Sequence, residues 1–352
     1  MIGSVEQNRF LTKHQKNRRG LGVKIATMAI ITILISLFVC ILLASAEFFL
    51  RVYYRNVLSS PSGYSYFYNK NYSLFKKEMN ALKMREKNFI ATGIKKYRVL
   101  VLGDSLTWGQ GVYPMEKRFT EQTEHLFNQA APNKEQQIDV LNTGQCGLDL
   151  PTYLKILPFI NTIDKNFVLY QWFVNDMDIG RNIKEFKTPH LIPNAKIHRY
   201  LFGHSVLYFL LQRGYRILRQ KTGKQKSYVK YLHDKLKDPN GKAAMKARKL
   251  LNRLIDNFEQ RGTPIGIVIF PGFWGPMDDY PLDFLHEQVL DVCKARHLDC
   301  LDLRETYRGV NFKKLWANPF DPHPGELAHK MAAEAIYAHY GPFWRDMIDR
   351  HQ

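Results

Sequence analysis

A hydroxyl, an imidazole and a carboxylate occur in two short polar segments of this 352-residue sequence. Ser105 lies in the segment 103–109 (GDSLTWG), and His323 lies between two prolines, two residues after Asp321. A serine oxygen becomes a nucleophile when a histidine removes its proton and a carboxylate orients that histidine. These side chains would supply the nucleophile, the base and the orienting carboxylate for acyl transfer through a serine ester if the fold brought them together.

Acyl transfer also needs hydrogen-bond donors for the negative oxygen that develops during attack. Segment 142–147 (NTGQCG) has glycines that allow backbone N–H groups to face a ligand, and Asn175 offers a side-chain amide. Each feature is common on its own, since a Gly-Asp-Ser often forms a turn and Asn175 or His323 can simply cap a helix. Their joint occurrence favours acyl transfer.

The surrounding pattern predicts the elements that would position these residues. Five apolar runs, predicted as strands, alternate with helical patterns, which predicts a parallel sheet covered on both faces. We therefore expect an α/β fold, a flavodoxin-like three-layer sandwich whose ligands bind at the carboxyl ends of the strands. The predicted strands are 97–102, 138–141, 167–173, 264–270 and 298–303. The predicted helices are 117–130, 151–163, 245–260, 284–296 and 326–340, the last ending at Gly341-Pro342.

On these residues the chain, from about 95 to 345, resembles the SGNH/GDSL hydrolase family. Segment 101–106 (VLGDSL) resembles the nucleophile block, and Gly147, Asn175 and His323 match the residues of the other three blocks. The resemblance implies that Ser105 is the nucleophile and His323 the base. It also implies an oxyanion hole formed by the backbone amides of Ser105 and Gly147 and the side chain of Asn175.

Two positions depart from the family pattern. The third block usually begins with glycine, where this chain has Phe173. The family's carboxylate commonly precedes the histidine by three residues, which is Phe320 here, so Asp321 is the candidate. A Ser–His dyad oriented by a backbone carbonyl is the alternative to an Asp321 triad, and an inactive member of the family is a further one.

The N-terminal region is predicted to be a membrane anchor. Residues 25–46 contain no charged side chain and would span about 33 Å as a helix. The basic segment 1–24 then stays in the cytoplasm, which makes this a single-pass protein of a bacterial inner membrane with a periplasmic domain. A signal peptide cut after Ala46 is the alternative, because Ala44-Ser45-Ala46 fits a cleavage site. Residues 47–94 are interpreted as a stalk or lead-in.

The net charge of +19 is concentrated rather than spread over the chain. Residues 181–253 contain 19 Lys or Arg against three Asp or Glu. Because the charge is local and the sequence contains no recognised binding motif, we expect no nucleic-acid partner. The basic insert 178–242 is a cap over the site, a membrane-contacting element or a solvated subdomain. The first two alternatives suggest an anionic or lipid-borne substrate.

Four cysteines are too few for a disulfide scaffold, but Cys293 and Cys300 lie close enough in sequence to form a bridge, with two unpaired thiols as the alternative. No metal-ligand spacing is present, so neither metal nor cofactor is expected. The sequence predicts an exported serine ester hydrolase or O-acyltransferase acting on acyl, first of all acetyl, esters of a cell-envelope glycan. A lipid esterase such as a lysophospholipase, and an inactive glycan-binding assembly factor, are the alternatives.

Overall fold

A computed structural model describes residues 3–60, 75–80, 84–87 and 96–351 of the chain. Its centre is a five-stranded parallel sheet in the order β2-β1-β3-β4-β5. The strands are β1 (Tyr97–Leu102), β2 (Ile138–Asn142), β3 (Phe167–Trp172), β4 (Ile265–Ile269) and β5 (Cys300–Asp302). This strand order is that of flavodoxin-like folds, so the predicted fold class is confirmed.

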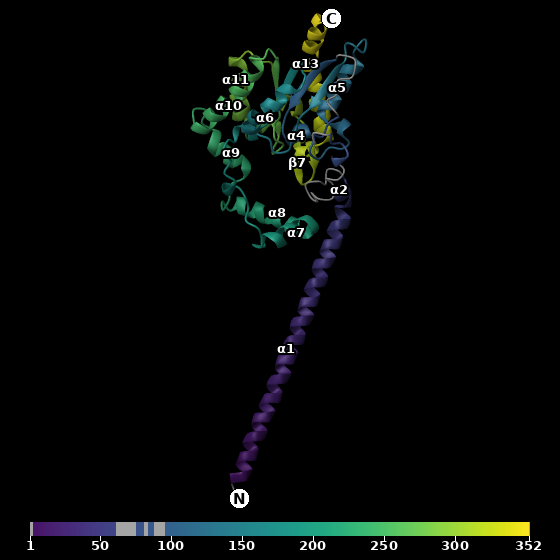
Figure 1. Cartoon of the computed structure of the whole chain (residues 1–352). Coiled ribbons are helices and arrows are strands. Elements are labelled where there is room, and N and C mark those ends of the chain that lie inside the picture. The colour runs from purple at the N-terminus through teal and green to yellow at the C-terminus, as the bar shows by residue number, and fades with distance from the viewer. Residues whose placement is uncertain (1–2, 61–74, 81–83, 88–95, 352) are drawn as a thin grey trace.

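Helices cover both faces of the sheet and complete three layers (Figure 1). On one side α5 (Phe119–Gln129) packs against α13 (Glu326–His351). On the other, α10 (Lys242–Glu259) packs against α6 (Leu150–Thr162) and α11 (Asp283–Ala295). The buried side chains of α10 follow the spacing of one helical face, as the sequence predicts: Leu251, Leu254, Ile255 and Phe258.

Several short elements connect these layers and carry the polar segments. They are α4 (Ser105–Trp108), η2 (Met115–Lys117), η3 (Val174–Met177), η5 (Met277–Asp279), α12 (Arg304–Tyr307) and η6 (Phe312–Leu315). Two strands outside the main sheet, β6 (Trp316–Asn318) and β7 (Asp321–Pro324), pair antiparallel. Sequence patterning did not predict this hairpin, because each strand has only three or four residues.

The last helix differs from the prediction. It does not end at Gly341-Pro342 but continues to His351, with Pro342 inside it. Proline removes one helical hydrogen bond, but Trp344, two residues later, is fully buried and packs against Phe127 and Tyr340. The burial of this indole, and of Ile348 beyond it, accounts for the continuation of the helix.

Cys293, near the end of α11, and Cys300, at the start of β5, form a disulfide. The structure therefore has the bridge rather than the two unpaired thiols. Cys40 and Cys146 are free.

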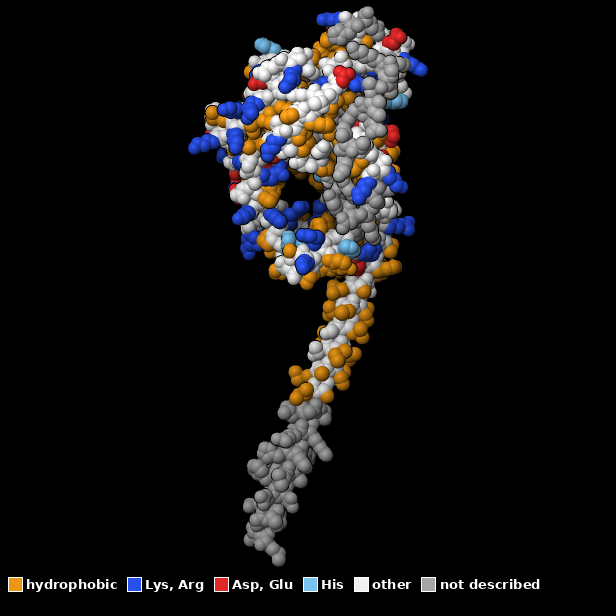
Figure 2. Space-filling model, viewed as in Figure 1, with side chains coloured by type: hydrophobic (Ala, Val, Ile, Leu, Met, Phe, Trp, Pro, Cys, Tyr) orange, Lys and Arg blue, Asp and Glu red, His pale blue; other side chains and the backbone are white. Residues whose placement is uncertain are grey.

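The N-terminal helix α1 (Gly3–Tyr53) is continuous and extends away from the domain (Figure 1). Its segment Lys24–Tyr53 is long and apolar enough to cross a membrane, and none of its most apolar stretch is buried against the protein. Figure 2 shows these apolar side chains exposed along the helix. A second helix, α2 (Arg55–Ser59), follows directly.

The lead-in 47–94 includes residues that pack into the domain. Phe75 is buried against Trp108, and Arg85 and Glu86 are buried as well. The boundaries 1–24, 25–46, 47–94 and 95–345 remain predictions.

The basic insert forms an arm on the side of the domain that carries α4 and β7 (Figure 1). It contains η4 (Ile183–Glu185), α7 (Ala195–His204), α8 (Val206–Lys221) and α9 (Tyr228–Leu236). The start of α8 is held by Glu47 of α1, whose carboxylate accepts from the Ser205 hydroxyl and from the backbone N–H groups of Val206 and Leu207. The insert thus runs from the domain to the domain-proximal part of α1, and Figure 2 shows an opening between the insert and the domain, with Lys and Arg side chains around it.

Candidate active site

Ser105 is held at the carboxyl end of β1, as the first residue of α4. The Asp104 carboxylate caps α4 by accepting from the Leu106 backbone N–H at 2.9 Å. Gln171 of β3 fixes the same turn, since its Oε1 accepts from the Asp104 backbone N–H at 3.1 Å and from the Thr107 hydroxyl at 2.9 Å. A Cβ at Gly103 would lie 1.9 Å from Thr107 Oγ1, so only glycine fits there. The turn is therefore tightly packed behind a half-buried Ser105.

His323 lies on β7 with its ring between Ser105 and Asp321. Its Nε2 lies 3.1 Å from Ser105 Oγ, and its Nδ1 lies 2.5 Å from Asp321 Oδ1. Alternate side chains of a strand point to the same side, which is why a carboxylate two positions before the histidine can reach it. The structure thus brings the three residues together, and the contact to the imidazole is made by Asp321 rather than by a backbone carbonyl.

The charge around His323 raises its pKa above the ordinary value. Burial alone lowers this pKa, but the charge and hydrogen bond of Asp321, together with the charge of Asp104, outweigh it. An imidazolium at this position is therefore stabilised. That is the form that arises when a histidine takes a proton from a serine.

The predicted oxyanion donors surround the same turn. Asn175, in η3 after β3, donates its Nδ2 hydrogens to Asp104 Oδ2 at 2.8 Å and to the Leu148 carbonyl at 3.4 Å. Gly147 lies in the exposed turn after β2 at φ +81°. That turn is tied to the nucleophile loop by a hydrogen bond from the Gln145 N–H to the Gly103 carbonyl at 3.1 Å.

The backbone donors are available for a substrate. Within the described residues, neither the Ser105 N–H nor the Gly147 N–H donates a hydrogen bond to the protein. The Asn175 amide differs, because a substrate oxygen would have to share it with Asp104 and Leu148.

A small cavity of about 120 Å³ adjoins His323. Leu106, Phe173 and Trp274 form its apolar walls, with Pro322 beside the histidine. The Phe173 ring lies 5.8 Å from the Trp274 ring. The residue that replaces the family's usual glycine is therefore a wall of the cavity next to the histidine.

Arg85 binds the backbone carbonyls at the end of α4 and just after it, and it was not identified from the sequence. Its side chain is 1% exposed and donates to the carbonyls of Trp108, Gly109 and Val112 at 3.1, 2.8 and 2.7 Å. Glu78 pairs with it at 2.7 Å. Arg85 lies in the lead-in, whose sequence contains many other basic residues, so the sequence gives no signal for this role.

Asp104 and Gln171 were also missed, although each has a sequence signal. Asp104 directly precedes the candidate nucleophile, and Gln171 is a polar residue within an apolar strand. Burial raises the pKa of Asp104, while hydrogen bonds from Leu106 and Asn175 oppose that rise. Among the described residues, no group of three or more His, Cys, Asp or Glu is arranged to hold a metal ion.

No protein-family model matches this chain, and no curated protein matches it significantly. Several solved structures are similar to it, with 11–15% sequence identity. A lipolytic G-D-S-L family member from Veillonella parvula is 14% identical over 70% of this chain and 98% of that chain, with a TM-score of 0.38. A family 3 carbohydrate esterase from Clostridium thermocellum is 14% identical over 72% and 100%, with a TM-score of 0.44.

A catalytic mutant of an acetylxylan esterase from Geobacillus stearothermophilus is 13% identical over 72% of this chain and 97% of that chain, with a TM-score of 0.44. These values are too low to carry an argument about substrate or activity. The chemistry of the site must follow from the contacts of its own residues. The chain thus resembles the SGNH/GDSL family in its motifs and is similar to solved members of the G-D-S-L lipolytic family.

Proposed function

We propose that this protein is a serine ester hydrolase or O-acyltransferase in which Ser105 is the nucleophile, His323 the general base and Asp321 the carboxylate that orients it. The observation that carries this proposal is the continuous contact from Ser105 Oγ to His323 Nε2, at 3.1 Å, and from His323 Nδ1 to Asp321 Oδ1, at 2.5 Å. A carboxylate beside Nδ1 favours the tautomer whose Nε2 accepts the serine proton. A protein that only binds glycans would have no need of this relay.

The reaction follows from these contacts. His323 takes the hydroxyl proton as Ser105 Oγ forms a bond to the ester carbonyl carbon, and the carbonyl electrons move to the oxygen. The N–H groups of Ser105 and Gly147, with the Asn175 amide, donate to that oxygen. When the tetrahedral intermediate collapses, the bond to the leaving alcohol breaks and His323 gives it the proton. Water, or a sugar hydroxyl in a transferase, then attacks the Ser105 ester in the same way.

The cavity beside His323 favours a short acyl group. Ligand pockets commonly measure about 300–1,000 Å³, whereas this cavity measures about 120 Å³. An acetyl group fits this space better than a long fatty acyl chain, which supports an acetyl ester of a cell-envelope glycan over a lysophospholipid. Phe173 and Trp274 limit its size.

The location proposed for this reaction is the periplasmic face of a bacterial inner membrane. The apolar segment of α1 would be the anchor, and the basic residues before it would keep the N-terminus in the cytoplasm. If a peptidase cut after Ala46, Glu47 would become the new N-terminus. The intact mass of the protein isolated from membranes distinguishes the two forms.

Hydrolysis of a chromogenic acetate ester by the full-length protein in detergent tests the proposal. We expect Ser105→Ala and His323→Ala to reduce kcat/KM at least 10³-fold, because each removes a member of the triad. Ser59→Ala, which changes an exposed serine at the end of α2, is the matched control and should match the wild type. A folded Ser105→Ala protein that retains full activity would overturn the proposal.

The fate of the acyl group needs a second assay. An acetyl donor is supplied together with an oligosaccharide acceptor, and the products are followed by mass. Acetylated oligosaccharide that depends on Ser105 identifies a transferase. Free acetate without acetylated oligosaccharide identifies a hydrolase.

A further inference from the structure

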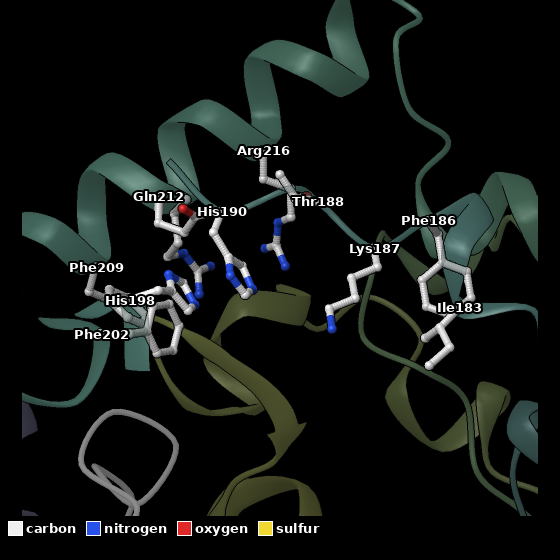
Figure 3. Close-up of a pocket in the computed structure, with 11 residues that line it drawn as sticks. Ile183, Phe186, Lys187, Thr188, His190, His198, Phe202, Phe209, Gln212 and Arg216 are labelled. Carbon is white, nitrogen blue, oxygen red and sulfur yellow. The ribbon is translucent and has the colours of Figure 1, made fainter. Parts of the chain in front are cut away.

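The insert contains a second cavity, separate from the one beside His323. It measures about 350 Å³ and lies between the segment 183–190 and helices α7 and α8. Its polar lining includes Lys187, His190, His198, Arg213 and Arg216. Figure 3 shows the side chains of Lys187, His190 and Arg216 directed toward one space. Among the described residues that line the cavity, none is an Asp or Glu.

The positive charges of Lys187 and Arg216 are not balanced by an acidic side chain among the described residues. Within the described part of the chain, neither Lys187 nor Arg216 belongs to an ion pair. The pKa of His198 is lowered, first by burial and then by the charges of His190 and Lys187. Cations gathered in one concave site without carboxylates favour an anionic ligand.

Several contacts hold Arg213 and the two histidines in place. Arg213 donates to the Phe320 carbonyl at 2.8 Å, and its guanidinium lies 5.5 Å from the Phe209 ring centre. The His190 and His198 rings stack at 3.5 Å, and His198 Nδ1 lies 2.8 Å from the Tyr208 hydroxyl. The buried Gln212 amide donates to the Pro189 carbonyl, next to His190, at 3.0 Å. The side of the cavity formed by Arg213 and the histidines is therefore fixed by contacts within the protein, and Lys187 and Arg216 lie on its exposed side.

The cavity is connected to the candidate active site in two ways. Phe320, which holds Arg213, directly precedes Asp321. Three aromatic rings also connect the walls of the two cavities. The ring of Phe186, which lines the cavity of the insert, lies 5.0 Å from the Tyr228 ring. The Tyr228 ring lies 6.0 Å from the ring of Trp274, which lines the cavity beside His323. The walls of the two cavities are therefore joined by packed side chains.

We propose that the cavity lined by Lys187, Arg213 and Arg216 binds a phosphate group of the substrate whose acyl ester is presented to Ser105. A guanidinium group donates two parallel hydrogen bonds to phosphate oxygens, and the lysine adds a further positive charge for a group that carries up to two negative charges. This inference rests on the proposed function and adds the class of substrate, a phosphate-bearing acylated molecule. The phosphate belongs either to a lipid head group or to a soluble sugar phosphate.

The binding of inorganic phosphate and of glycerol 3-phosphate to the full-length protein in detergent tests the site, with titration calorimetry as the readout. We expect saturable binding by the wild type and at least tenfold weaker binding by the double variant Lys187→Gln/Arg216→Gln. Both side chains are exposed, so their neutralisation leaves the core intact. Lys221→Gln, at the exposed end of α8 and outside the cavity, is the matched control and should bind like the wild type.

The result that overturns the inference is equal binding by the wild type and the double variant, or no saturable binding by the wild type. Because phosphate binding is measured without turnover, this failure is distinct from a loss of esterase activity. The same titration in lipid nanodiscs identifies the source of the phosphate. If a lipid head group fills the cavity, phosphatidylglycerol in the disc weakens the apparent affinity for inorganic phosphate relative to phosphatidylcholine. Equal affinity in the two discs indicates a soluble phosphate compound.

Discussion

Asp321 and His323 lie two residues apart on the short strand β7, and the Asp321 carboxylate lies 2.5 Å from His323 Nδ1. The same Oδ1 accepts from the His323 backbone N–H at 3.1 Å, so it fixes both the ring and the strand. Asp321 is 3% exposed, which keeps this interaction out of water. The family's carboxylate commonly precedes the histidine by three residues, and here it precedes it by two. Because alternate side chains of a strand point to the same side, Asp321 still reaches the imidazole.

The pH dependence of kcat/KM should report His323. A protonated imidazole cannot take the serine proton, so activity rises with pH through the pKa of His323, which lies above its ordinary value of 6.5. Asp321→Asn removes the charge that raises this pKa, so the acid limb should move to lower pH while the maximal rate falls by about 10⁴. Asp299→Asn, which changes the surface partner of His339, should leave the profile unchanged. An unmoved acid limb in Asp321→Asn would contradict the assignment.

Replacing Asn175 tests the oxyanion hole. Its amide lies next to Asp104 at the nucleophile turn, where it can turn toward a substrate oxygen. We expect Asn175→Ala to lower kcat about 10²–10³-fold on an acetate ester. A change confined to KM would assign this side chain to ground-state binding instead.

Gly144 should tolerate no side chain, because the turn after β2 packs directly on α4. A Cβ at this position would lie 2.4 Å from the Trp108 backbone nitrogen and 2.7 Å from the Thr107 carbonyl carbon. Gly144→Ala should therefore displace α4 and abolish most of the esterase activity. Gly262→Ala is the control, since Gly262 has φ +66° and open space around it, and it should cost only about 1–2 kcal/mol of stability. Equal activity in the two variants would exclude this close approach.

Arg85 should contribute strongly to stability. Arg85→Ala leaves three carbonyls and Glu78 without their buried partner, which costs about 3–5 kcal/mol. Urea unfolding of the detergent-solubilised protein measures this free energy. Arg308→Ala removes an exposed arginine that pairs with Glu305 and Asp278, and should leave the urea midpoint nearly unchanged, because water screens these exposed pairs.

The strands and the residues at their ends could be predicted from the sequence because both rest on local patterns. The central strands β3 and β4 are fully buried, mostly apolar runs, and Ser105 and Asn175 follow β1 and β3 closely. Gly341-Pro342 was misleading because the local signal for a helix end is outweighed by the burial of Trp344, which depends on residues far away in the sequence.

Other features of the site depend on contacts that no local pattern shows. The support of α4 by Arg85 joins residues more than 20 positions apart. The Arg213 side chain of the cavity in the insert is held by the Phe320 carbonyl, 107 positions away. Composition identified the insert as basic. Only the arrangement of its side chains shows where an anion would bind.

The most direct test of the central claim is the covalent modification of Ser105. The full-length protein is treated with a fluorophosphonate, digested, and its peptides are mapped by mass. We expect one adduct, on the peptide that contains Ser105, with labelling lost in Ser105→Ala and strongly slowed in His323→Ala. A folded wild-type protein that is not labelled, or is labelled equally well with Ser105 replaced, would contradict the account.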